Sequence, residues 1–230
     1  MADRSTCPSM TAVLFDLDGT LLNTLGDIAE SMNAALIERG FEGHPEDRYA
    51  GFVGDGVVQL AVRTLPAEAR QAQTIDRLVY RFREIYADRA TDRSRPYPGI
   101  ESMLTELRQA GYHLAVNSNK PQAMCRRCLE ALLPDHPFAA VVGQQNGMPL
   151  KPDPAGALDI ARSIDVDPKT VVYVGDSDVD MRTAVNAGMH GAGVLWGFRT
   201  GRELRDNGAE ALIEKPEDLP GLLRCWPHQE

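Results

Sequence analysis

The chain has 230 residues, of which 43% are hydrophobic and 25% charged, and its formal net charge is −9. This length suits one large domain or a domain with a sizeable insertion. The acidic balance argues against nucleic acid and anionic membranes as the main partners. No apolar run is long enough to span a bilayer, and residues 1–10 lack the apolar stretch of a signal peptide. We therefore expect a cytoplasmic protein with no membrane partner.

The first expected element is a core strand within residues 11–20. Its apolar run ends at Asp16, and Asp18 follows two positions later. Burying one carboxylate is costly, and burying two side by side costs more. Side chains at i and i+2 of an extended chain point the same way, so both acids can address one spot. The same Asp-x-Asp-Gly sequence also fits a calcium loop or a turn.

Residues from about 25 to 95 have an almost wholly helical pattern. Apolar side chains recur on one helical face over 25–36 and again, more strongly, over 75–86. Between these stripes, the glycine-rich residues 51–56 predict a turn that leads into another helix ending at Leu65. The sequence thus predicts a helical insertion after the first strand.

From Tyr97 onward, short apolar runs alternate with helical stripes. The predicted strands are His113–Val116, Ala139–Val142, Val171–Val174, Gly193–Trp196 and Ala211–Ile213. Predicted helices begin at Ile100, at Pro121, at Pro154, after Asp180 and at Asp218. This alternation predicts an α/β fold with a doubly wound, Rossmann-like parallel sheet. The expected domains are a core of residues 1–24 and 96–230 and a helical insertion of residues 25–95.

Polar residues follow four of the predicted core strands, directly or after a short loop. Ligands of an open parallel sheet bind beyond the carboxyl ends of its strands, so these residues predict one site. The clusters are Asp16, Asp18 and Thr20 after the first strand, residues 117–120 after the second, residues 151–154 after the third and residues 175–180 after the fourth.

Asp176 would bring a third carboxylate to Asp16 and Asp18. The three can all remain ionised only beside a compensating cation. Oxygen ligands with open positions suit Mg²⁺, which keeps several waters and accepts phosphate oxygens. Ser118 as a donor and Lys151 as a fixed positive charge would suit the phosphate itself.

Several of these residues also have simpler interpretations. Ser118 fits a helix cap, and Lys151 fits a solvated surface position. Asp180 fits a first-turn acid stabilised by the helix dipole, or a supporting group at the metal. Cys125 and Cys128 match C-x-x-C, but no second pair completes a zinc site, so we expect two thiols on a packed helix.

Taken together, these residues resemble the four motifs of the haloacid dehalogenase-like phosphohydrolases, in the family's order. The insertion resembles that family's small α-helical cap. Ser118 stands where the phosphoglycolate phosphatase branch usually has Thr, which keeps the hydroxyl, and Asn23 stands where Asp is common. The segments that resemble this branch are Pro96–Gly99, Asn119–Pro121, Trp196–Arg199 and the Gly54-Asp55-Gly56 turn.

The resemblance implies a two-step phosphoryl transfer, with Asp16 as nucleophile and Asp18 as general acid and base. It implies Mg²⁺ held by Asp16, the backbone carbonyl of Asp18, and Asp176. Ser118 and Lys151 would hold the phosphoryl oxygens, with Thr20 and Asn119 contributing to the phosphate-binding loops.

The resemblance also implies a small phosphorylated metabolite as partner and a protein that is a monomer or a homodimer. We expect 2-phosphoglycolate as substrate, whose carboxylate would meet Arg48, Arg63 or Arg199. A sugar phosphate, a nucleotide or pyrophosphate are alternative substrates. A phosphosugar mutase and, more remotely, a receiver-like signalling module are alternative functions.

Overall fold

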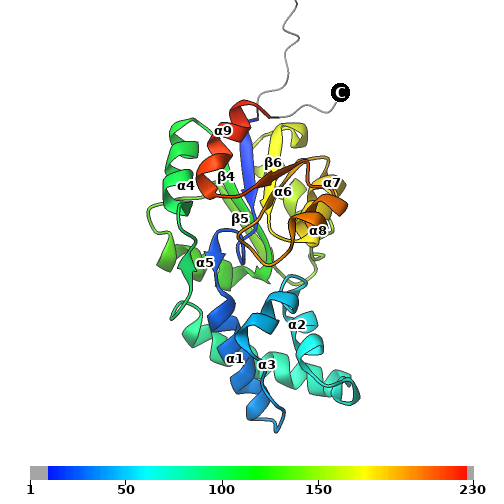
Figure 1. The fold of residues 1–230 in the computed structure, drawn as a ribbon. Helices are drawn as coiled ribbons and strands as arrows, with labels where there is room; N and C mark the ends of the chain where they lie inside the picture. Colours follow the sequence, from blue (N-terminus) through cyan, green and yellow to red (C-terminus); the bar gives the residue numbers. More distant parts are fainter. Residues whose placement is uncertain (1–9, 227–230) are drawn as a thin grey trace, which may run out of the picture.

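The computed structural model describes residues 10–226, so the expectations for the first nine residues, Cys7 included, lie outside it. Its centre is a six-stranded sheet with strand order β5-β4-β1-β6-β7-β8 (Figure 1). Every neighbouring pair is parallel, which confirms the predicted α/β class. The strands are β1 (Ala12–Phe15), β4 (His113–Pro121), β5 (Ala140–Gln144), β6 (Val171–Gly175), β7 (His190–Val194) and β8 (Ala211–Ile213).

Strand β1 explains why its sequence is continuously apolar. It lies between β4 and β6, and its four residues are fully buried. Val13 and Phe15 face one hydrophobic cluster, whereas Ala12 and Leu14 face the other. Helices α4 (Ile100–Gln109), α5 (Gln122–Leu132) and α9 (Leu219–Arg224) supply the first cluster, and α6 (Ala155–Ser163) and α7 (Asp178–Ala187) supply the second.

The helical insertion consists of α1 (Leu25–Ile37), α2 (Gly56–Thr64) and α3 (Ala72–Arg89), and it lies beyond one end of the sheet (Figure 1). Its own core includes Met32, Leu36, Leu78 and Phe82. At its neck, β2 (Leu22–Asn23) pairs antiparallel with β3 (Arg95–Pro96). We call residues 25–95 the cap and the rest the core; these boundaries stay a prediction.

The remaining elements are short. They are helix α8 (Gly201–Asp206) and the 3₁₀ turns η1 (Glu46–Gly51), η2 (Ala67–Ala69), η3 (Pro168–Thr170) and η4 (Pro216–Asp218). Within residues 10–226, no helix combines the length and apolar character needed to cross a bilayer.

Several element boundaries differ from the sequence-based expectation; for example, β5 runs on to Gln144 and β7 begins at His190. Strand β4 runs on to Pro121, with an irregularity in its pairing between Asn117 and Pro121. Strand β7 ends at Val194, so Trp196 lies in the loop that follows. Helix α7 begins at Asp178, ahead of Asp180, because Ser177 forms a capping box with that acid.

Candidate active site

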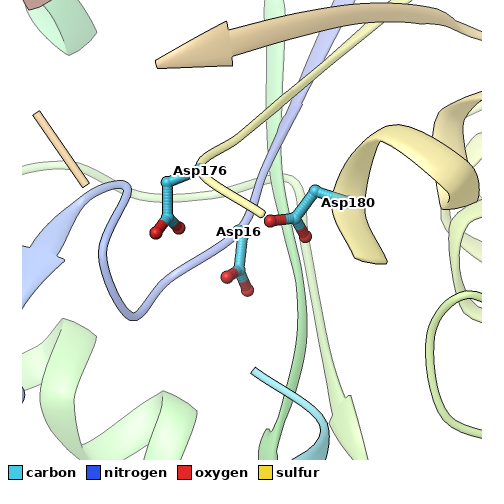
Figure 2. Close-up of side chains that lie close together, drawn as sticks. All are labelled: Asp16, Asp176 and Asp180. Carbon is cyan, nitrogen blue, oxygen red and sulfur yellow. The ribbon is translucent and has the colours of Figure 1, made fainter. Parts of the chain in front are cut away.

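Three buried carboxylates meet at the carboxyl end of the sheet. Asp16 follows β1, Asp176 follows the adjacent β6, and Asp180 lies in the first turn of α7 (Figure 2). One oxygen of each lies within 4.8 Å of the others. The register of β1 on β6 places Phe15 opposite Val174, so the residues after both strands emerge side by side.

The loop after β7 and the turn after β1 together hold Asp176. Thr20 Oγ1 donates a hydrogen bond to Oδ1 at 3.0 Å, and the backbone N–H of Phe198 donates to Oδ2 at 2.8 Å. Burial, with the nearby charges of Asp180 and Asp16, raises the pKa of Asp176 to about 8. Asp176 is thus positioned by neutral donors that do not neutralise its charge.

Gly19 allows this turn to approach Asp176 closely. Its φ of +91° lies in the left-handed region, and a Cβ there would lie 2.4 Å from Asp176 Oδ2. A side chain at this position would therefore be strained and would also displace the carboxylate.

Lys151 is the cation between the other two acids. Its Nζ lies 2.8 Å from Asp16 Oδ1 and donates to Asp180 Oδ1 at 2.6 Å. Burial lowers the pKa of Lys151, but the charges of Asp16 and Asp180 outweigh it and hold the pKa well above its usual value. Burial raises the pKa of Asp16 to about 6, although the charge of Lys151 opposes that rise. The positive charge of Lys151 thus favours the ionised form of Asp16.

The Asp18 side chain does not join this cluster, because the chain turns directly after Asp16. Its Oδ1 accepts from Thr24 Oγ1 at 2.8 Å and from Lys120 Nζ at 2.7 Å. Lys120 Nζ also donates to the hydroxyl oxygen of Tyr86 in the cap at 2.6 Å. Asp18 therefore lines the same cavity as Asp16 but does not join the three-carboxylate cluster, because the chain is extended only in β1.

The charges at the site suit a divalent cation. Four carboxylates and two ammonium groups meet here, so negative charges exceed positive charges by two, and Asp176 takes part in none of the ion pairs of residues 10–226. The three clustered groups offer only oxygen ligands, as Mg²⁺ prefers. The residues present therefore fit the expected cofactor.

A cavity of about 230 Å³ opens from this site towards the cap. Asp16, Asp18, Ser118 and Lys120 line its core end. Most of the cap end is apolar, formed by Ile28, Val53, Val57, Leu60 and Phe82. Drug-sized ligands occupy pockets of roughly 300–1,000 Å³, so this cavity suits a small molecule.

The other predicted phosphate-binding residues differ in how many hydrogen bonds their side chains already make within the protein. Ser118 lines the cavity, and within residues 10–226 its Oγ has one hydrogen-bond partner, the backbone N–H of Lys120, which donates to it at 3.4 Å. The side chain of Asn119 donates to the carbonyls of Gly54 and Lys151 and accepts from the Lys151 N–H. This favours direct phosphate contact for Ser118 and a positioning role for Asn119. The Thr20 hydroxyl is likewise already engaged, because it donates to Asp176.

The three arginines expected near the leaving group do not line this cavity. Arg199 donates to the carbonyls of Ala50 and Val53, the latter at 3.0 Å, and so ties the core to the cap. Arg63 is paired with Asp55. Arg48 is exposed.

Cys125 and Cys128 lie buried and unpaired on α5, as the packed-helix interpretation predicted. Their thiols point to backbone carbonyls, those of Lys120 and Ala90. Burial raises the pKa of both thiols, which disfavours the reactive thiolate.

Sequence reasoning placed Lys120 among the polar residues at the strand ends but missed its pairing with Asp18, the contribution of Tyr86 and the full part played by Asp180. Lys120 stood in a segment resembling the phosphoglycolate phosphatase branch, and Tyr86 closed the apolar stripe of α3. Their hydrogen bond to each other, across 34 residues of chain, and the ion pair of Lys120 with Asp18 mark them as part of the site.

A family model described as haloacid dehalogenase-like hydrolase matches residues 13–194, which span β1 to β7. The chain belongs to this family. It is 36% identical over 215 residues to a phosphoglycolate phosphatase of Cupriavidus necator, covering 93% of each chain. It is also 36% identical over 221 residues to a phosphoglycolate phosphatase of Cereibacter sphaeroides, covering 94% of this chain and 98% of that one.

Solved structures agree with the fold of this haloacid dehalogenase-like hydrolase. A crystal structure from Lactobacillus delbrueckii subsp. bulgaricus has a TM-score of 0.88 and 30% identity, covering 94% of this chain and 98% of that one. The match therefore includes the helical cap as well as the sheet.

Proposed function

We propose that this haloacid dehalogenase-like hydrolase is a Mg²⁺-dependent phosphatase that converts 2-phosphoglycolate to glycolate and phosphate. The observation that carries this proposal is the floor of the cavity, where Asp16, Asp18 and Ser118 face one small space. The relatives named phosphoglycolate phosphatase support the choice of substrate.

Asp16 is the nucleophile in this proposal. A carboxylate oxygen of Asp16 bonds to phosphorus as the ester P–O bond breaks, giving an aspartyl-phosphate and dividing one displacement into two easier ones. Lys151, 2.8 Å from Asp16 Oδ1, offsets the negative charge that would otherwise oppose attack on an anionic ester. The hydroxyl of Ser118 donates to a phosphoryl oxygen.

Asp18 moves the protons. It gives a proton to the departing alkoxide and takes one from the water that then attacks the aspartyl-phosphate. Thr24 and Lys120 fix its carboxylate at the boundary between core and cap, beside the cavity. When bound, Mg²⁺ would be held by Asp16, Asp176 and the backbone carbonyl of Asp18, with Asp180 in support, and would supply positive charge for the phosphoryl group.

The test is phosphate release from a panel of small phosphate esters in the presence of Mg²⁺. We expect the highest kcat/KM for 2-phosphoglycolate, with sugar phosphates, nucleotides and pyrophosphate below it. Preference for one of these others would replace the proposed substrate, and transfer to a second sugar hydroxyl without free phosphate would indicate a mutase.

A further inference from the structure

The cap end of the cavity contains one cation that the site described so far does not use. Of the described residues that line the cavity, two carry positive charge, Lys120 and Arg83. Lys120 is paired with Asp18 at 2.7 Å. The side chain of Arg83 has no ion-pair or hydrogen-bond partner in residues 10–226, although Arg81 on the same helix is paired with Glu38.

The position of Arg83 on α3 places it at the leaving-group side. The ammonium group of Lys120 donates both to the Tyr86 hydroxyl on α3 and to Asp18, the proposed acid–base residue. The Tyr86 end of the helix therefore lies close to Asp18. Arg83 precedes Tyr86 by three residues, so it lies on a neighbouring part of the same face, roughly 4.5 Å along the axis. A substrate with its phosphorus at Asp16 and its ester oxygen near Asp18 would extend towards Arg83.

The surroundings of Arg83 explain what it would recognise. The neighbouring cap walls are apolar, for example Val57, Leu60 and Phe82. An anionic group that enters such a space loses water and needs a charged partner. Because Asp18 already compensates Lys120, Arg83 is the cation that remains available to such a group.

We propose that Arg83 determines substrate choice by binding an anionic group on the leaving-group side of the ester. In 2-phosphoglycolate this group is the carboxylate, and its planar pair of oxygens matches the fork of a guanidinium. This role rests on the proposed function and goes beyond it, because it assigns selection to the cap helix α3. It replaces Arg48, Arg63 and Arg199, which face elsewhere.

The experiment compares 2-phosphoglycolate with 2-hydroxyethyl phosphate, a neutral ester of the same length. The measured quantity is the ratio of their kcat/KM values in the wild type and in Arg83→Gln. Loss of one charge-assisted contact should lower this ratio roughly 10- to 100-fold. Arg83→Lys should restore part of it, because the charge returns without the fork.

Two further variants sharpen the test. Arg83→Glu should reverse the preference in favour of O-phosphorylethanolamine, whose leaving group carries a positive charge. Arg77→Gln is the matched control: Arg77 is exposed on the same helix and does not line the cavity, so the ratio should stay at its wild-type value.

The outcomes separate this role from the proposed function. If the wild type prefers 2-phosphoglycolate and Arg83→Gln keeps that preference, the role of Arg83 is overturned and the substrate stands. If the wild type shows no preference for the anionic ester, both are overturned. Equal losses on both esters in Arg83→Gln would also overturn the specificity role.

Discussion

The two ends of the cavity are built in opposite ways. At the core end, ionisable groups lie at or just beyond strand ends and have polar partners, as Lys151 has in Asp16 and Asp180. At the cap end, the walls are mainly apolar side chains of helices, and Arg83 is exposed and unpaired within the described chain. This difference supports the proposals made above, in which the core end performs chemistry common to phosphate esters and the cap end selects among them.

The largest effect expected at the core end is that of Asp16→Asn. Removing the nucleophile should lower kcat roughly 10⁵-fold on every ester, because the covalent route is lost. The fold should survive, because the Asn side chain has nearly the shape of Asp and carries no charge to be buried. Burial already disfavours the charged form of Asp16, whose pKa is raised to about 6. Kinetics with circular dichroism as the folding control check this, and near-normal activity would refute the assignment.

Removing the metal should also bring turnover to background, and Mg²⁺ should restore it. Ca²⁺ should bind but support turnover poorly, because its coordination is larger and looser. Phosphate release after chelation and repletion is the measurement. Full activity in excess chelator would exclude the role given to the carboxylate cluster.

Stability of the metal-free protein should depend on pH through the same cluster. The pKa values of Asp16 and Asp176 are raised to about 6 and about 8, above the ordinary 3.8. The folded chain then holds more protons than the unfolded chain, so its free energy of unfolding falls as pH rises from about 4 to about 8. Each group contributes at most about 1.4 kcal/mol per pH unit.

Urea unfolding at pH 6 and pH 8, with chelator and with Mg²⁺, measures this dependence. Mg²⁺ should stabilise the folded chain more at pH 8, where it competes with fewer protons. Asp176→Asn is the control and should flatten the dependence in chelator. A free energy of unfolding that rises between these pH values in the metal-free wild type would contradict the prediction.

Asp18→Asn tests the residue that lies between the core end and the cap end of the cavity and is proposed to move the protons. Loss of proton transfer should lower kcat by ~10²- to 10⁴-fold. The loss should be smaller for p-nitrophenyl phosphate, whose leaving group needs less protonation, than for 2-phosphoglycolate. Equal losses on both esters would place the defect in the water step or in the position of Lys120 rather than in leaving-group protonation.

The smallest expected effect concerns Arg199, which joins the two ends without lining the cavity. Arg199→Ala removes its hydrogen bonds to the carbonyls of Ala50 and Val53 and should weaken cap closure. We expect kcat/KM to fall roughly 10-fold, equally for anionic and neutral esters. A loss confined to 2-phosphoglycolate would return Arg199 to the role now assigned to Arg83.

The sequence by itself determined the features that depend on residues close to one another along the chain. The apolar run before Asp16, the helical stripes of the cap and the alternation after Tyr97 each follow a local period, and the structure has these elements close to the predicted bounds. The polar motifs after the predicted strands likewise placed Asp16 and Asp176 at one edge of the sheet.

The tertiary structure alone decided which side chains meet. Asp180 joins the cluster and Asp18 leaves it, because a capping box and a tight turn aim these two side chains. Arg83 faces the cavity because α3 docks over the sheet end and brings Tyr86 onto Lys120. Such contacts join residues far apart in the chain, and no local period of the sequence encodes the docking of cap on core.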